Sequence, residues 1–118
     1  MIVGTLRILP LPNRRNEVLE ILRSVQGPAL AQRGCVACDV YDEQGPEHAV
    51  VLVERFDSDE ALQVHLRSEM YRRILGALEL SRGKPDVRFE HVVTSEGMEL
   101  IERYRLAAGT PHAKVDET

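Results

Sequence analysis

The chain has 118 residues and a mass of 13.3 kDa, which is enough for one domain and too little for two. It is 43% hydrophobic and 29% charged, a composition that excludes collagen-like and wholly disordered proteins. The net charge of −4 has the wrong sign for a protein that binds phosphates, and the three Tyr and two Phe, with no Trp, offer little surface for stacking bases. We therefore expect no nucleic-acid partner.

The chain also lacks the signals of a membrane or secreted protein. No run approaches the roughly 18 apolar residues that a membrane-spanning helix needs, and residues 1–9 are too short and too polar for a signal peptide. Two cysteines are too few for a disulfide scaffold and are consistent with a reducing compartment. We expect a cytoplasmic protein with no membrane partner.

The first half of the chain predicts a strand, a helix and the first strand of a hairpin. β-branched residues in 2–9 predict a strand that ends at Pro10, which has no backbone donor. A helix follows with Asn13 as N-cap, and Gly27-Pro28 is expected to interrupt it. Residues 35–43 form the next expected strand.

The second half predicts the rest of the hairpin, a kinked helix, a strand and a terminal helix. Residues 48–56 complete the hairpin, and a helix capped at Asp57 or Ser58 is expected to kink near Ser68. The remaining expected elements are a strand at 87–95, a helix at 98–108 and a mobile polar tail at 109–118. We treat 1–97 as the folded domain and 98–118 as a C-terminal helix and tail.

This order of elements predicts an α+β fold of the ferredoxin-like type, β-α-β-β-α-β, in which both helices cover one face of an antiparallel sheet. The third strand is apolar at both odd and even positions from Ala49 to Val53, although a strand with one wet face should alternate. The helices of so short a chain can cover only one face. We therefore expect a homodimer in which the uncovered sheet faces pack together.

Three stretches, residues 34–41, 50–56 and 58–71, resemble the antibiotic biosynthesis monooxygenase family of dimeric α/β-barrel proteins. The most specific features are the glycine before the second strand, the strand ending Glu54-Arg55-Phe56, and the helix that carries His65. The resemblance implies a ferredoxin-like dimer with a cavity between helices and sheet. It also implies that the chain could oxidise phenols or hydroquinones with O₂, as some members do without metal or flavin.

Proton removal makes a phenol a far better electron donor to O₂, so one base in a water-excluding site could suffice. His65 is the candidate base, because it leans toward the buried side of its helix and imidazole titrates near neutral pH. The alternative is a structural histidine at the margin of the core.

The candidate substrate-binding residues are Tyr71, His91 and Arg55. Their alternatives are core packing for Tyr71, an interface hydrogen bond for His91 and a surface ion pair for Arg55.

Cofactor sites are not expected. Cys35 and Cys38 match C-x-x-C, but on a regular strand residues i and i+3 point to opposite faces, which disfavours a redox or metal pair. No second Cys or His pair completes a zinc site, so we expect no metal and no other cofactor. The haem-degrading branch of the family needs an Asn early in the first strand and a Trp, and this chain has neither.

Three functions therefore remain. The leading hypothesis is a cofactor-independent monooxygenase that acts on a small phenolic or quinol-type substrate. The first alternative is a non-catalytic dimer of the same fold that binds a small ligand or acts in a stress response. The second is an isomerase that uses the same base without oxygen.

Overall fold

A computed structural model of the protein describes residues 1–109, and the part of the predicted tail from residue 110 onward lies outside them. The elements, in chain order, are β1 (Ile2–Ile8), α1 (Arg15–Leu30), β2 (Cys35–Asp42), β3 (Val50–Phe56), α2 (Asp59–Arg67), α3 (Glu69–Leu78), β4 (Asp86–His91) and α4 (Met98–Gly109).

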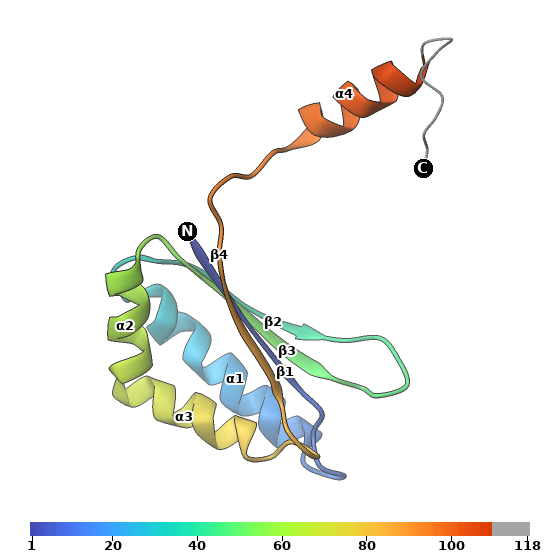
Figure 1. Ribbon diagram of the computed structural model, residues 1–118. Helices are drawn as coiled ribbons and strands as arrows, with labels where there is room; N and C mark the ends of the chain where they lie inside the picture. Colours follow the sequence, from blue (N-terminus) through green and yellow to red (C-terminus); the bar gives the residue numbers. More distant parts are fainter. Residues whose placement is uncertain (110–118) are drawn as a thin grey trace.

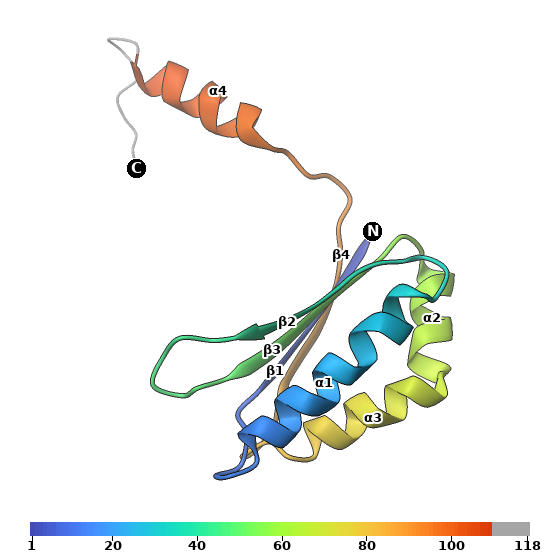
Figure 2. The same cartoon turned by 180° about the vertical axis from the view of Figure 1, so that it is seen from behind.

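The strands form one antiparallel sheet in the order β2-β3-β1-β4. Figures 1 and 2 show α1, α2 and α3 on one face of this sheet, with α4 standing apart. In the centre of the sheet, Leu6 of β1 lies opposite Leu52 of β3 and Val87 of β4. The α+β, ferredoxin-like prediction with an extra C-terminal helix is confirmed.

The core lies between the sheet and the helices. β1 and β3 alternate strictly between buried residues that face the helices and more exposed residues that face the other way. The largest fully buried apolar side chains come from these strands and from α1 and α3: Phe56, Leu6, Ile8, Leu22, Leu52 and Ile74. Burial of each such side chain contributes about 1.5–3 kcal/mol, so these layers fix the position of every other element.

Two serines set the boundaries of α2 and α3. The Ser58 hydroxyl caps α2 by accepting from Ala61 N at 3.1 Å. Ser68 ends α2 in an extended conformation and caps α3, its hydroxyl accepting from Tyr71 N at 3.3 Å. The predicted kink near Ser68 is confirmed, and it turns the chain so that α2 and α3 approach the core from different directions.

Two predictions for α1 are wrong. The helix runs through Pro28, and Ala31 N donates to Gly27 O at 3.1 Å beyond it. Pro28 has no N–H to donate to the carbonyl of Ser24. The lost hydrogen bond costs little stability because Ser24 is exposed to water. Asn13 is not the N-cap: Arg14 takes that position, and Asn13 has a left-handed φ of 69° in the preceding turn.

The predicted opposite orientation of the two cysteines is also wrong. A β-bulge between Cys35 and Ala37 shifts the register of β2 against β3. Because of the extra residue, Cys35 and Cys38 are both buried on the helix side, while Val36 is 52% exposed. Both thiols are free.

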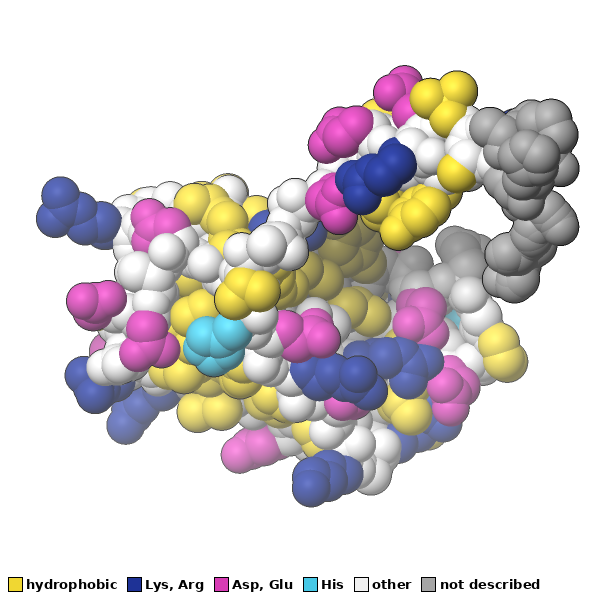
Figure 3. Space-filling model, turned by 45° about the horizontal axis from the view of Figure 1, so that its top comes forward, with side chains coloured by type: hydrophobic (Ala, Val, Ile, Leu, Met, Phe, Trp, Pro, Cys, Tyr) yellow, Lys and Arg dark blue, Asp and Glu magenta, His cyan; other side chains and the backbone are white. Residues whose placement is uncertain are grey.

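The other face of the sheet and α4 remain largely uncovered. The outer face has a half-buried centre formed by Val3, Thr5, Ala37, Val51 and Val53. α4 extends from the end of β4 on the side away from the helices, and Figure 3 shows hydrophobic side chains on α4 and in the hollow below it. Within residues 1–109, no helix is long and apolar enough to cross a membrane.

Candidate functional site

A carboxylate and an imidazole meet inside the protein between β3 and α2. Glu54 and His65 are each only 1% exposed, and they are the two buried polar or charged residues of the described chain. Glu54 Oε2 lies 2.8 Å from His65 Nε2. The two atoms are at ion-pair distance, but Nε2 has no directed hydrogen bond to any group of residues 1–109.

The second ring nitrogen fixes the orientation of the imidazole. His65 Nδ1 lies 2.7 Å from Gln32 Oε1, and because an amide oxygen can only accept, Nδ1 carries a proton and donates it. Nε2 is then the ring nitrogen that faces Glu54 Oε2 at 2.8 Å. A carboxylate and an imidazole nitrogen in such contact are groups suited to general acid–base chemistry.

Two aromatic rings enclose the imidazole. The Phe56 ring centroid lies 5.1 Å from that of His65, and the Tyr71 ring meets His65 edge-on at 5.2 Å. Burial, and to a smaller degree the charge of Glu54, raises the pKa of Tyr71 to about 12. At neutral pH the Tyr71 phenol is therefore a proton donor.

A thiol completes the inner surroundings of Glu54. Cys38 Sγ lies 3.6 Å from Glu54 Oε2 and donates a weak hydrogen bond to it. Burial, followed by the charge of Glu54, raises the pKa of Cys38 well above that of an ordinary thiol. Cys38 is thus a neutral donor to the carboxylate, and not a nucleophile.

The close approach of α2 to the sheet depends on Gly34, which precedes β2. Gly34 has a φ of +85°, and a Cβ at this position would lie 2.4 Å from Ala61 Cβ and 2.7 Å from Asp57 Oδ1. Only glycine satisfies both the backbone and the space here. This contact seats the first turn of α2, which in turn positions His65 one turn later.

The structure brings together only part of the predicted set. The break at Ser68 turns Tyr71 toward His65, as a straight helix would not. His91 is exposed on the edge strand β4 and, within the described chain, makes no hydrogen bond, ion pair or ring contact with His65. Arg55 points to the outer face, because it pairs with Val3 and Ala37.

Sequence reasoning missed Glu54 and Gln32. The signal for Glu54 was present: it occupies the same alternating position as Val50, Leu52 and Phe56, which all face the core. A carboxylate at such a position needs a buried partner. Gln32 lies in the turn after α1 and carried no comparable pattern.

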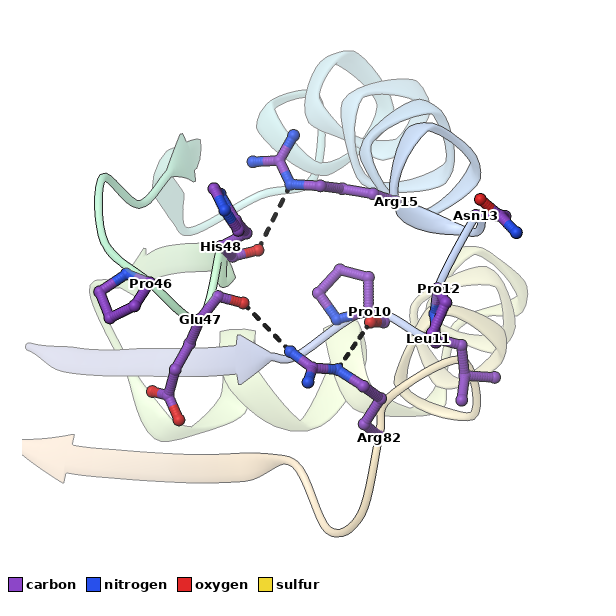
Figure 4. A pocket seen from close by; sticks show the side chains of 9 residues that line it. All are labelled: Pro10, Leu11, Pro12, Asn13, Arg15, Pro46, Glu47, His48 and Arg82. Atoms are coloured by element: carbon purple, nitrogen blue, oxygen red, sulfur yellow. Dashed lines mark hydrogen bonds between the residues drawn. The ribbon is translucent and has the colours of Figure 1, made fainter.

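Two surface pockets lie away from this pair. The one in Figure 4, of about 310 Å³, lies between the β1–α1 turn and the β2–β3 loop, where β1 ends and β3 begins. Its two arginines hold that loop in place: Arg15 donates to His48 O at 3.3 Å, and Arg82 donates to Glu47 O at 3.1 Å and to Pro10 O at 3.0 Å. Another pocket, of about 340 Å³, includes Arg55 and the chain leaving β4. Neither of these two pockets is lined by Glu54 or His65.

The donor groups near Glu54 do not form a metal site. Within residues 1–109, no three His, Cys, Asp or Glu side chains converge in a way that could hold a metal ion. The chemistry that the cluster itself offers is acid–base chemistry, from a carboxylate, an imidazole and a phenol.

The fold is shared by a class of small α+β proteins with solved structures. A Mycobacterium tuberculosis protein, Rv0793, is 26% identical over 81% of this chain and 98% of its own, with a TM-score of 0.72. A structure described as an antibiotic biosynthesis monooxygenase is 20% identical over 80% of this chain and 100% of its own, with a TM-score of 0.70. PA3566 of Pseudomonas aeruginosa is 19% identical over 79% of this chain and 94% of its own, with a TM-score of 0.68. The last two likenesses establish the fold alone.

The family model described as antibiotic biosynthesis monooxygenase matches residues 1–77, which include Glu54, His65 and Tyr71. The chain belongs to the antibiotic biosynthesis monooxygenase family. No curated protein matches the chain significantly.

Proposed function

We propose that this protein is a cofactor-independent monooxygenase that oxidises a small phenolic or quinol-type molecule with O₂. The observation that carries the proposal is the buried Nε2 of His65, which lies beside a carboxylate and to which no group of the described chain makes a directed hydrogen bond. Membership of a family named for monooxygenases supports the same reaction class.

In the proposed reaction the Glu54–His65 pair removes the phenolic proton from the substrate. The resulting anion gives an electron to O₂, and the two radicals combine at a ring carbon to form a hydroperoxide. Loss of water then leaves a quinone, so that one oxygen atom enters the product, the other becomes water, and the substrate supplies both hydrogens. No external reductant is needed. Gln32 keeps the ring oriented through Nδ1, and Tyr71 stays protonated at neutral pH and can donate to a developing oxyanion.

Substrate access in this proposal requires displacement of α2. Only Leu62 and His65 of this nine-residue helix are buried, and its two ends are set by serine caps, so few apolar contacts oppose its movement. Closure of α2 over the substrate would exclude bulk water from the reacting anion.

The active unit that we propose is a homodimer formed through the outer sheet faces. The half-buried apolar centre of the outer face supports this pairing, since it is the side of the sheet that the helices leave uncovered. Sedimentation at micromolar concentration tests it, and Val53→Asp, which places a charge in that centre, should separate the copies.

Oxygen uptake with a panel of hydroquinones, anthrones and naphthols tests the reaction. Wild type should consume one O₂ per product formed, and His65→Ala and Glu54→Gln should each lose at least about a hundredfold in rate, the low end of a general base's contribution. His48→Asn, which changes an exposed loop histidine with a φ of 53° to a residue that tolerates this conformation, is the matched control and should keep the rate. No uptake with any compound would contradict the proposal.

A second candidate is an isomerase that uses the same pair without O₂. It is favoured by the scarcity of aromatic rings around His65, since only Phe56 and Tyr71 contact it among the described residues. Turnover that proceeds equally under argon, with exchange of a substrate C–H proton for deuterium from solvent, would support this candidate over the monooxygenase.

A further inference from the structure

The pocket in Figure 4 takes no part in the chemistry proposed above. It has a volume of about 310 Å³ and lies where the β1–α1 turn, the β2–β3 loop and the segment after α3 meet. Sites for small molecules have volumes of about 300–1,000 Å³ and mostly apolar walls with a few fixed polar groups. The apolar side chains of this wall are Pro10, Leu11, Pro12 and Pro46.

The backbone around this pocket adopts an unusual conformation at two positions. Asn13 has a φ of 69° and His48 a φ of 53°, and in the part of the chain that the structure describes no other residue except glycine has a positive φ. Both residues line the pocket. Non-glycine residues in this region of backbone space are uncommon, and they cluster at functional sites such as ligand clamps. The two strained positions therefore single out this pocket as a candidate binding site.

Arg82 places a fixed cation in the pocket. Its Nε donates to Pro10 O at 3.0 Å and its Nη2 donates to Glu47 O at 3.1 Å. Within residues 1–109 these are the two hydrogen bonds of the guanidinium, and both acceptors are neutral carbonyls. Nη1 therefore keeps both of its hydrogens for a ligand. Because the guanidinium is already held in place, an anion that binds it loses little affinity to the ordering of a flexible side chain.

The other charged side chains of the wall already have partners of opposite charge. Arg15 pairs with Asp42, and the Glu47 carboxylate accepts from Arg7 Nη2 at 2.9 Å. Arg82 thus leaves a single positive charge for a ligand to neutralise. A single charge suits a carboxylate better than a phosphate dianion, and the flat guanidinium matches the geometry of a carboxylate.

We propose that this pocket binds a small monocarboxylate with an apolar or aromatic body, such as benzoate. Arg82 holds the carboxylate through Nη1, and the body of the ligand packs on the proline rings of the wall. The site is separate from Glu54 and His65, so the proposal does not rest on the oxidation described above.

The first test follows backbone amide NMR signals of the wild-type protein during titration with benzoate. A ligand of so few atoms should bind with a dissociation constant of about 1–10 mM. The shifted signals should come from residues 10–15, 46–48 and 81–83. Benzamide has the same ring and no charge, so it should bind at least about tenfold more weakly. Shifts that do not saturate, shifts centred on His65, or equal binding of benzamide would each overturn the proposal.

The second test replaces the cation. Arg82→Gln should weaken benzoate binding at least about tenfold, since it removes a charged hydrogen-bond donor. Arg72→Gln is the matched control, because it removes the same charge from an exposed position on α3 outside the pocket, and it should leave the dissociation constant unchanged. Urea unfolding checks that Arg82→Gln still folds, and if it does not, the wild-type comparison of benzoate with benzamide decides. A folded Arg82→Gln that binds benzoate as tightly as wild type would overturn the proposal.

Discussion

Substitution of Gly34 by alanine should damage both stability and the candidate site. Gly34 adopts a φ of +85°, and its Cβ would meet Ala61 at 2.4 Å and Asp57 at 2.7 Å. The added methyl group therefore forces a strained backbone and pushes against the first turn of α2. Because α2 carries His65, the same change should lengthen the contact between His65 and Glu54.

The size of the effect follows from two separable terms. A non-glycine residue in the left-handed region costs about 1–2 kcal/mol, and overpacking of a tight contact costs about 1–3 kcal/mol. Gly34→Ala should thus lower the free energy of unfolding by about 2–5 kcal/mol. For a domain of this length that corresponds to a fall in Tm of about 8–20 °C.

Two other glycines allow the cost of the backbone conformation to be separated from the cost of overpacking. Gly83 has a φ of +68° with nothing within 4 Å of its Cβ position, so Gly83→Ala should cost only the backbone term, about 1–2 kcal/mol. Gly76 lies inside α3 with open space around it, so Gly76→Ala should stabilise the protein by about 0.5–1 kcal/mol.

Urea unfolding followed by circular dichroism measures all three variants, and imidazole NMR signals report whether His65 keeps its environment. If Gly34→Ala were no less stable than Gly83→Ala, with unchanged His65 signals, α2 would not be seated against Gly34 and our account of how the site is positioned would be wrong.

Three further predictions concern the buried cluster. Glu54→Leu and His65→Leu should each lower the free energy of unfolding in urea by about 3–5 kcal/mol, because each leaves a buried polar partner unpaired. The double variant should lower it by at least about 1 kcal/mol less than the sum of the two single losses, and strict additivity would mean that the pair does not interact. Cys38 should not react with Ellman's reagent at pH 8 until urea unfolds the protein, because burial raises its thiol pKa; rapid labelling of native protein would contradict this. Tyr71 should ionise near pH 12, as read by absorbance at 295 nm, because its pKa is raised from 10.0 to about 12. The stability that Tyr71 contributes is therefore complete below pH 10 and declines up to about pH 12, and Tyr71→Phe should remove this decline.

The sequence predicted the architecture because several of its signals are local. The β-branched stretch that ends before Pro10, the serine caps at Ser58 and Ser68, and the Gly/Pro turn of the hairpin each have a local cause that is also found in the fold. The errors occurred where tertiary context decides. The bulge after Cys35 changes which face each cysteine occupies, and no local pattern distinguishes a bulged strand from a regular one.

The candidate site was only partly predictable for the same reason. His65 and Tyr71 were identified on one stretch of chain, and the break at Ser68 brings their rings together. Glu54 lies on a different element, and its pairing with His65 depends on how closely α2 approaches β3 through Gly34. Contacts between distant segments of this kind are fixed by packing, and the sequence indicates only that an inward-facing carboxylate must find a partner.

Oxygen consumption by wild type and by His65→Ala, measured in ¹⁸O₂ with a substrate from the phenolic panel, tests the proposed chemistry most directly. We predict that wild type incorporates one ¹⁸O atom into the product, releases the other as water, and loses this activity when the imidazole is removed. Product formation at the same rate in both proteins, or product that carries no ¹⁸O, would contradict a proton-abstracting monooxygenase built on Glu54 and His65.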